Sequence, residues 1–132
     1  MAAGGWIPRL GAPRELPDWL TAADLDYYVD EFTRAGFRGG INLYRNFQRN
    51  WEITPELDGA KISEPVLFLA GEKDLVIRGM DQAFLEKIMG RVASDLRGVK
   101  LLPEAGHWIQ QELPAETNAA LVEFLKSLDE TS

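Results

Sequence analysis

Two side chains that could move a proton follow short apolar runs in the second half of the chain. Asp74 closes the stretch Pro65-Val-Leu-Phe-Leu-Ala-Gly-Glu-Lys-Asp74, and His107, the only histidine, lies in Pro103-Glu-Ala-Gly-His107-Trp. A carboxylate that accepts the Nδ1 proton of an imidazole fixes the tautomer and the orientation of that ring. The two residues therefore predict a histidine base with its orienting acid, provided that the fold brings them together.

Each of the two residues also has a plainer interpretation. Aspartate is common in turns, and Glu72 is a neighbouring candidate for the acid. A lone histidine is usually a structural or surface residue. Its position after a strand, preceded by Gly106 and followed by Trp108, favours a base at His107.

The elements around the pair predict an α/β fold. Residues 66–70 form a continuous apolar run, typical of a strand buried on both faces of a parallel sheet. The following pattern predicts a helix at 78–90, a partly helical connection at 91–98, a strand at 99–102 and a closing helix at 114–128. This βαβα order implies parallel strands with helices packed on the sheet. Asp74 and His107 would then lie past the carboxyl ends of neighbouring strands, where open α/β sheets place their chemistry.

The first half of the chain is predicted to be helical after an irregular start. Residues 1–17 are rich in glycine and proline and predict a flexible loop. Thr21 and Asp24 form an acidic version of the capping box at the start of a helix, and Gly36 is expected to end it.

A second helix is predicted at residues 41–51, after a turn at 37–40 and before a polar connector at 54–64. Tyr44, Phe47 and Trp51 fall on one face of this helix. An aromatic stripe at helical spacing is far more typical of packing than of catalysis. The pattern alone therefore assigns no chemistry to Tyr44.

The composition excludes several classes of function. The 132 residues amount to one domain, and the formal net charge of −7 disfavours binding to nucleic acid or to an anionic membrane. The absence of cysteine and the single histidine leave no disulfide framework and remove most zinc arrangements, so we expect no metal and no cofactor. No apolar run has the length of a membrane span or of a signal core. A cytoplasmic protein is the resulting expectation.

Three segments together resemble the C-terminal portion of an α/β-hydrolase of the soluble epoxide hydrolase family. Two are Gly71-Glu-Lys-Asp74 and Ala105-Gly-His-Trp108, which are similar to the acid and histidine segments of many α/β-hydrolases. The third, Phe37-Arg-Gly-Gly-Ile-Asn-Leu-Tyr-Arg-Asn46, followed by Gln48-Arg-Asn-Trp51, narrows the resemblance to the epoxide hydrolases. It covers roughly residues 16–128.

The resemblance implies a role for each candidate residue. His107 is the base and Asp74 its orienting acid, and Asp74 precedes His107 as the family's order of nucleophile, acid and histidine requires. Tyr44 lies on a lid helix and directs its hydroxyl to the oxygen of a small-molecule epoxide. The implied organisation is a flexible segment at 1–17, lid helices at 18–53, a connector at 54–64 and the C-terminal part of the hydrolase core at 65–132.

Other parts of the family's active site have no counterpart. No stretch resembles the nucleophile elbow, and the oxyanion hole and a further lid tyrosine are likewise unmatched. Two strands do not form a stable doubly covered sheet, so we expect a fragment, half of a two-chain enzyme, or a remnant that self-associates. On this basis the isolated chain is expected to be inactive. A haloalkane dehalogenase fragment and a non-catalytic interaction module are the alternatives.

Overall fold

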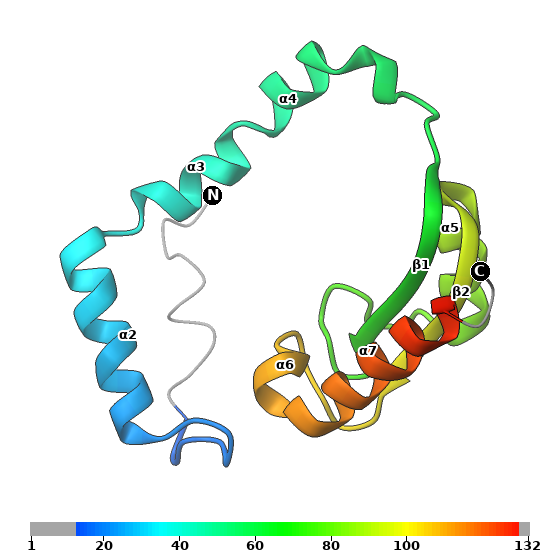
Figure 1. Ribbon diagram of the computed structural model, residues 1–132. Coiled ribbons are helices and arrows are strands. Elements are labelled where there is room, and N and C mark those ends of the chain that lie inside the picture. The colour runs from blue at the N-terminus through cyan, green and yellow to red at the C-terminus, as the bar shows by residue number, and fades with distance from the viewer. Residues whose placement is uncertain (1–12, 130–132) are drawn as a thin grey trace. The chain divides into compact units, whose positions relative to one another are not determined.

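The computed structural model describes residues 13–129, so most of the loop predicted at 1–17 lies outside the described residues. The chain divides between Arg49 and Asn50 into two compact units, each of which is described by itself. The first unit contains helices, and the second contains a two-stranded parallel sheet with helices on it (Figure 1).

The first helix in the described part of the chain, α2 (Ala22–Ala35), is bounded by the predicted caps. The N–H of Asp24 donates to Thr21 Oγ1 at 3.1 Å, and the N–H of Thr21 donates to Asp24 Oδ2 at 3.0 Å. Gly36 ends the helix with φ at 69°, a conformation that glycine adopts without steric cost. The capping box and the glycine cap are therefore confirmed.

The single helix predicted at 41–51 is wrong in its bounds. Two helices occupy the region, α3 (Arg38–Arg45) and α4 (Phe47–Ile53), and α4 crosses the boundary between the two units. The predicted turn at 37–40 is the start of α3, where the N–H of Ile41 donates to Phe37 O at 3.0 Å. The turn was predicted because two adjacent glycines have a low helix propensity. Propensity is a weak preference, and here the glycines are part of a helix all the same. The 3₁₀ turn Pro55–Leu57 follows in the connector.

Strands β1 (Ile62–Gly71) and β2 (Ala93–Leu102) pair in parallel, as predicted. Both begin earlier than the apolar runs indicated, and the prediction of a partly helical connection at 91–98 is wrong. The first residues of each strand, which were not predicted, are largely polar or exposed and therefore form no apolar run. Pairing between backbones, as at Ile62–Ala93 and Pro65–Asp95, makes them strands instead.

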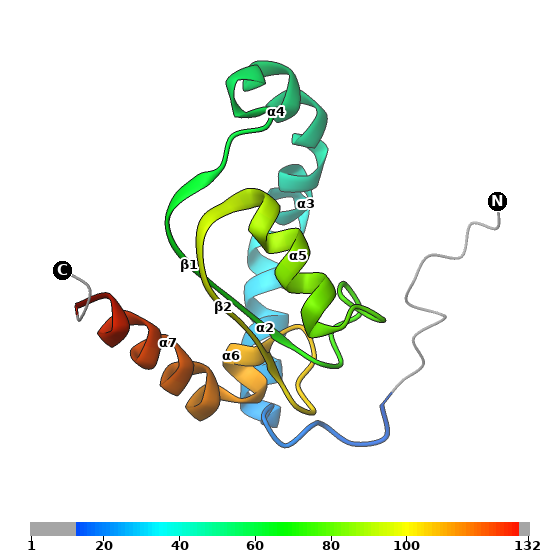
Figure 2. The same ribbon diagram turned by 90° about the vertical axis from the view of Figure 1, so that its right-hand side faces the viewer.

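Helices α5 (Gln82–Val92) and α7 (Pro114–Asp129) cover opposite faces of the sheet (Figure 2). Alternate residues of a strand face opposite sides. On one side Ala70 and Val99 form a core with Leu85 of α5. On the other side Leu67 and the α7 residue Phe124 line a shared cavity of about 370 Å³. The predicted layering of helices on a parallel sheet is confirmed.

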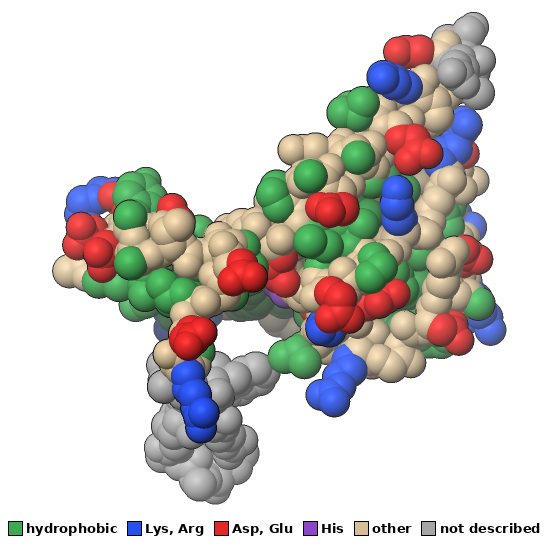
Figure 3. Space-filling view, turned by 90° about the horizontal axis from the view of Figure 1, so that it is seen from below, with side chains coloured by type: hydrophobic (Ala, Val, Ile, Leu, Met, Phe, Trp, Pro, Cys, Tyr) green, Lys and Arg blue, Asp and Glu red, His purple; other side chains and the backbone are tan. Residues whose placement is uncertain are grey.

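Much apolar surface remains exposed in the described residues, as the space-filling view shows (Figure 3). No large side chain there is fully buried, and residues 66–69 of β1 are only half-buried, although a strand covered on both faces was predicted. None of the helices described is both long and apolar enough to cross a membrane.

Candidate active site

The loops that follow β1 and β2 are joined by backbone hydrogen bonds beyond the ends of the strands. The N–H of Glu72 donates to Leu102 O at 3.0 Å, and the N–H of Lys73 donates to Ala105 O at 2.8 Å. Lys73 also forms an ion pair with Glu104 across the two loops. The loop bearing Asp74 and the loop bearing His107 are thus held side by side.

Gly71, the last residue of β1, permits the two loops to approach this closely. A Cβ atom at this position would lie 2.2 Å from the carbonyl oxygen of Gly106 and 2.3 Å from that of Ala105. Both contacts are with backbone atoms, which cannot rotate away as the end of a side chain can. The histidine loop therefore crosses directly over a position that only glycine can occupy.

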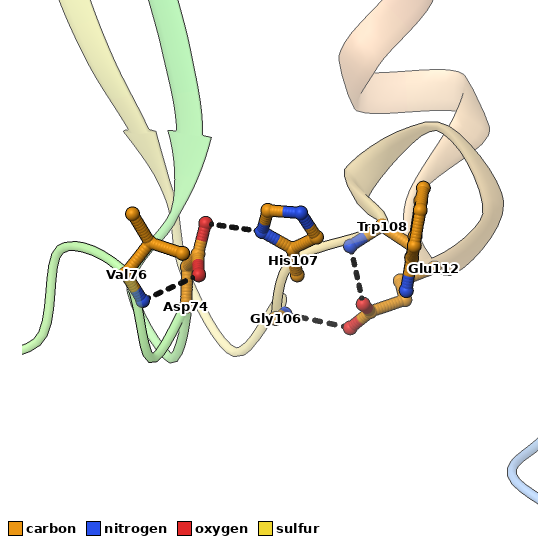
Figure 4. A network of polar contacts seen from close by, with 6 residues as sticks. All are labelled: Asp74, Val76, Gly106, His107, Trp108 and Glu112. Atoms are coloured by element: carbon orange, nitrogen blue, oxygen red, sulfur yellow. Dashed lines mark hydrogen bonds and ion pairs between the residues drawn. The ribbon is translucent and has the colours of Figure 1, made fainter. Parts of the chain in front are cut away.

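Asp74 and His107 form a hydrogen-bonded pair at this edge of the sheet (Figure 4). Asp74 Oδ2 lies 2.9 Å from His107 Nδ1, and Asp74 Oδ1 accepts a hydrogen bond from the N–H of Val76 at 2.8 Å. Within residues 13–129, Asp74 is the only charged residue that is buried, at 7% exposure. Glu72, the other candidate acid, is exposed.

Burial alone would raise the pKa of Asp74. The hydrogen bonds from the Val76 N–H and from His107, together with the charge of a protonated imidazole, outweigh that effect and hold this pKa below its ordinary value. Asp74 is therefore an ionised acceptor near neutral pH, the state in which it can hold a proton on His107 Nδ1.

The imidazole presents an accessible ring to solvent. The side chain of His107 is 55% exposed, and the ring of Trp108 lies edge-on to it with centroids 5.0 Å apart. With Nδ1 directed at the carboxylate, Nε2 is the nitrogen that can take a proton from water or from a substrate. The arrangement can therefore perform general base chemistry.

A third carboxylate, which the sequence analysis did not single out, contacts the histidine loop. Glu112 ends the short helix α6 (Ile109–Glu112), an element that was also not predicted. Its side chain accepts hydrogen bonds from the backbone N–H groups of Gly106 and Trp108, the two neighbours of His107 (Figure 4). A glutamate in the first turn of a helix is the one sequence signal that could have drawn attention to it.

Tyr44 lies in the first unit, on α3, and is 69% exposed. Its ring contacts Phe47 of α4, with centroids 5.5 Å apart. The catalytic roles of Tyr44, Asp74 and His107 remain predictions. In residues 13–129 no three His, Asp or Glu side chains gather as a metal site would require.

The chain is similar to several epoxide hydrolases. It is 48% identical over 127 residues to Epoxide hydrolase A of Mycobacterium tuberculosis (strain ATCC 25618 / H37Rv), a match that covers 95% of this chain and 38% of the relative. Epoxide hydrolase 3 of Siraitia grosvenorii is 36% identical over 115 residues, covering 86% of this chain and 36% of the relative. No protein-family profile matches the chain.

Solved structures agree with the sequence relatives. The crystal structure of Epoxide Hydrolase A from Mycobacterium thermoresistibile superposes with a TM-score of 0.81 at 53% identity, covering 93% of this chain and 37% of that protein. Epoxide hydrolase VrEH1 from Vigna radiata gives a TM-score of 0.79 at 32% identity, covering 88% and 37%.

The parallel pair, its helices and these matches define part of an α/β-hydrolase fold. More narrowly, the chain is homologous to a segment of the epoxide hydrolases, and it spans a little over a third of the length of these relatives. The resemblance predicted from the sequence is confirmed.

Proposed function

We propose that this chain supplies the base, its orienting acid and a lid tyrosine to an epoxide hydrolase. The single observation that carries the proposal is the hydrogen bond between Asp74 and His107, in a chain homologous to epoxide hydrolases over nearly its whole length. The substrate would be a small-molecule epoxide, which the complete enzyme opens to a vicinal diol.

The proposed reaction has two steps and needs no cofactor. An aspartate contributed by another part of the fold attacks an epoxide carbon, and the ring opens to give an alkyl-enzyme ester. Tyr44 donates its phenolic proton to the epoxide oxygen as negative charge develops there.

His107 acts in the second step. Oriented by Asp74, it removes a proton from water through Nε2 while that water attacks the ester carbonyl. As the tetrahedral intermediate collapses, the leaving alkoxide takes the proton of the newly formed carboxylic acid, so the diol departs and the aspartate is regenerated as a carboxylate. Return of the proton from the His107 imidazolium to the Tyr44 phenolate through solvent restores both residues. A chain without the nucleophile has no ester to hydrolyse, so the chain alone is proposed to be inactive.

A chimera tests this proposal. The chain would replace the matched segment of Epoxide hydrolase A from Mycobacterium tuberculosis, whose remaining part supplies the rest of the fold. Diol formation from an aryl epoxide such as styrene oxide is the expected result. His107→Gln should stall the second step, so that the alkyl-enzyme ester accumulates and adds the mass of the epoxide to the protein. A chimera that folds but forms neither diol nor ester would refute the proposal.

The role of Tyr44 is tested separately in the same chimera. Tyr44→Phe keeps the ring and removes the hydroxyl, so single-turnover alkylation should slow on the order of 10²-fold. Tyr27→Phe, at another exposed tyrosine of the first unit, is the matched control and should leave the rate unchanged. An unchanged rate in Tyr44→Phe would identify Tyr44 as a packing residue and would remove the most specific support for the epoxide assignment.

A further inference from the structure

The carboxylate of Glu112 spans the backbone on both sides of His107. Oε2 accepts from the N–H of Gly106 at 2.6 Å, and Oε1 accepts from the N–H of Trp108 at 3.0 Å. Hydrogen bonds to an ionised acceptor are roughly twice as strong as neutral ones. The two peptide units that flank the histidine are therefore fixed to one rigid group.

The carboxylate of Glu112 also lies close to the Cα of Gly106 and belongs to the turn that begins at Trp108. A Cβ atom on Gly106 would lie 3.1 Å from Glu112 Oε1 and 3.2 Å from Oε2, so a side chain at that position would press on the carboxylate. The N–H of Glu112 donates in turn to Trp108 O at 2.9 Å, which closes the first turn of α6. Glu112 is partly buried between the loop and the helix.

The contact also has a simpler interpretation. Trp108 is the N-cap residue of α6 and makes no side-chain cap hydrogen bond, so Glu112 could merely satisfy a free N–H at the start of a short helix. That interpretation accounts for the bond to Trp108. It does not account for the bond to Gly106, which lies outside α6 and on the other side of the histidine.

We propose that Glu112 is a positioning residue for His107, and that its hydrogen bonds to both flanking N–H groups direct the imidazole to Asp74. With the backbone fixed on either side, only the two side-chain torsions of the histidine remain free. The buried carboxylate of Asp74 then holds the ring at Nδ1. Glu112 contacts neither the imidazole nor a reacting atom and acts through the backbone. The proposal deepens the function proposed above and rests on it for its catalytic consequence.

The tautomer of His107 tests the proposal without any assay of activity. Because His107 is the only histidine in the 132 residues, its ring nitrogens give the only imidazole signals of the chain. Selective ¹⁵N-histidine labelling with magic-angle-spinning NMR reports the tautomer in dissolved and in associated protein alike. The wild-type chain should show the Nδ1–H form, and Glu112→Ala should show the mixed tautomers of an unrestrained imidazole.

Two further variants and a control complete the test. Glu112→Gln keeps the length but replaces one acceptor oxygen by an NH2 group, and should give an intermediate spectrum. Gly106→Ala would place a Cβ atom 3.1 Å from Glu112 Oε1, which a small shift of the carboxylate relieves, and should therefore lose the Nδ1–H form only in part. Glu116→Gln, at an exposed glutamate in the first turn of α7, removes one negative charge and should match the wild type.

Two results would overturn the proposal. If Glu112 serves only as a helix cap, all Glu112 variants should be less stable than the wild type but keep its tautomer. A wild-type chain with mixed tautomers would overturn it equally.

The chimera adds a kinetic measurement. Glu112→Gln should slow hydrolysis of the alkyl-enzyme ester about tenfold or more and leave alkylation unchanged, because only the second step uses the base. Equal slowing of both steps would contradict a role directed at His107. Should the wild-type chimera form no ester, the proposed function fails while the tautomer measurement still decides the role of Glu112.

Discussion

The substitution Gly71→Ala places a methyl group where the two loops of the candidate site cross. The new Cβ would lie 2.2 Å from Gly106 O, whereas Cβ atoms essentially never approach closer than 3.0 Å. The histidine loop must therefore move away from β1 by at least about 0.8 Å, the difference between these distances. The change introduces no backbone strain of its own, because Gly71 is an ordinary extended residue without a positive φ.

This displacement is large enough to break the pair. A shift of this size along the line between His107 Nδ1 and Asp74 Oδ2 would lengthen their 2.9 Å contact to about 3.7 Å, beyond hydrogen-bond range. Leaving the buried carboxylate without this partner costs about 1–3 kcal/mol of stability. A misplacement of about 1 Å in the base should slow ester hydrolysis in the chimera on the order of 10²-fold.

Two assays and one control check the expectation. Urea unfolding of the chain measures the loss of stability, and the rate of ester hydrolysis in the chimera measures the loss of function. Gly98→Ala is the matched control, since a Cβ there meets only Leu67 Cδ1 at an ordinary 3.5 Å. Stability and hydrolysis in Gly71→Ala equal to those of the wild type would refute the close approach of the loops.

Three further expectations follow from other parts of the chain. The pKa of Asp74 lies below its ordinary value because its hydrogen bonds outweigh the effect of burial, so its carboxylate stabilises the folded state at higher pH. The difference in unfolding free energy between the wild type and Asp74→Asn should be constant above about pH 5 and shrink as the pH falls below about 4. Unfolding free energies of the two proteins that stay equally far apart at every pH would contradict this. The isolated chain should self-associate through its exposed apolar residues, such as Phe84 and Leu121, and a compact monomer in sedimentation would refute this. Thr21→Ala removes the capping box of α2 and should cost about 0.5–2 kcal/mol of helix stability by circular dichroism, whereas Thr21→Ser should cost almost nothing.

The sequence predicts the parts of the fold that local chemistry determines. Thr21, Asp24 and Gly36 mark the ends of α2 because caps depend on neighbouring side chains and on backbone conformation alone. The two strands were found at their apolar ends, while their polar beginnings were missed. Those beginnings are strands because of pairing between distant segments, which a local pattern does not contain.

The residues of the candidate site likewise fall into those that the sequence predicts and those that it does not. Asp74 and His107 could be paired from the sequence because the carboxyl ends of adjacent parallel strands meet at one edge. The contact of Glu112 with the histidine loop could not be predicted from the sequence, because α6 has only four residues and shows no apolar periodicity. The contact of Gly71 with the histidine loop is equally invisible in the sequence, where the residue appears only as the end of an apolar run.

The geometry of the acid and base depends on few parts of the chain. The position of His107 relative to Asp74 depends on four features of the second unit. These are the parallel strand pair, the two backbone hydrogen bonds between the loops, the close approach of the histidine loop to Gly71, and the contact of Glu112 with the histidine loop. Tyr44 belongs to the first unit, where its ring contacts Phe47 and so joins helix α3 to helix α4. The geometry of the Asp74–His107 pair is therefore a property of the second unit alone, whereas the role proposed for Tyr44 depends on parts of the fold outside that unit.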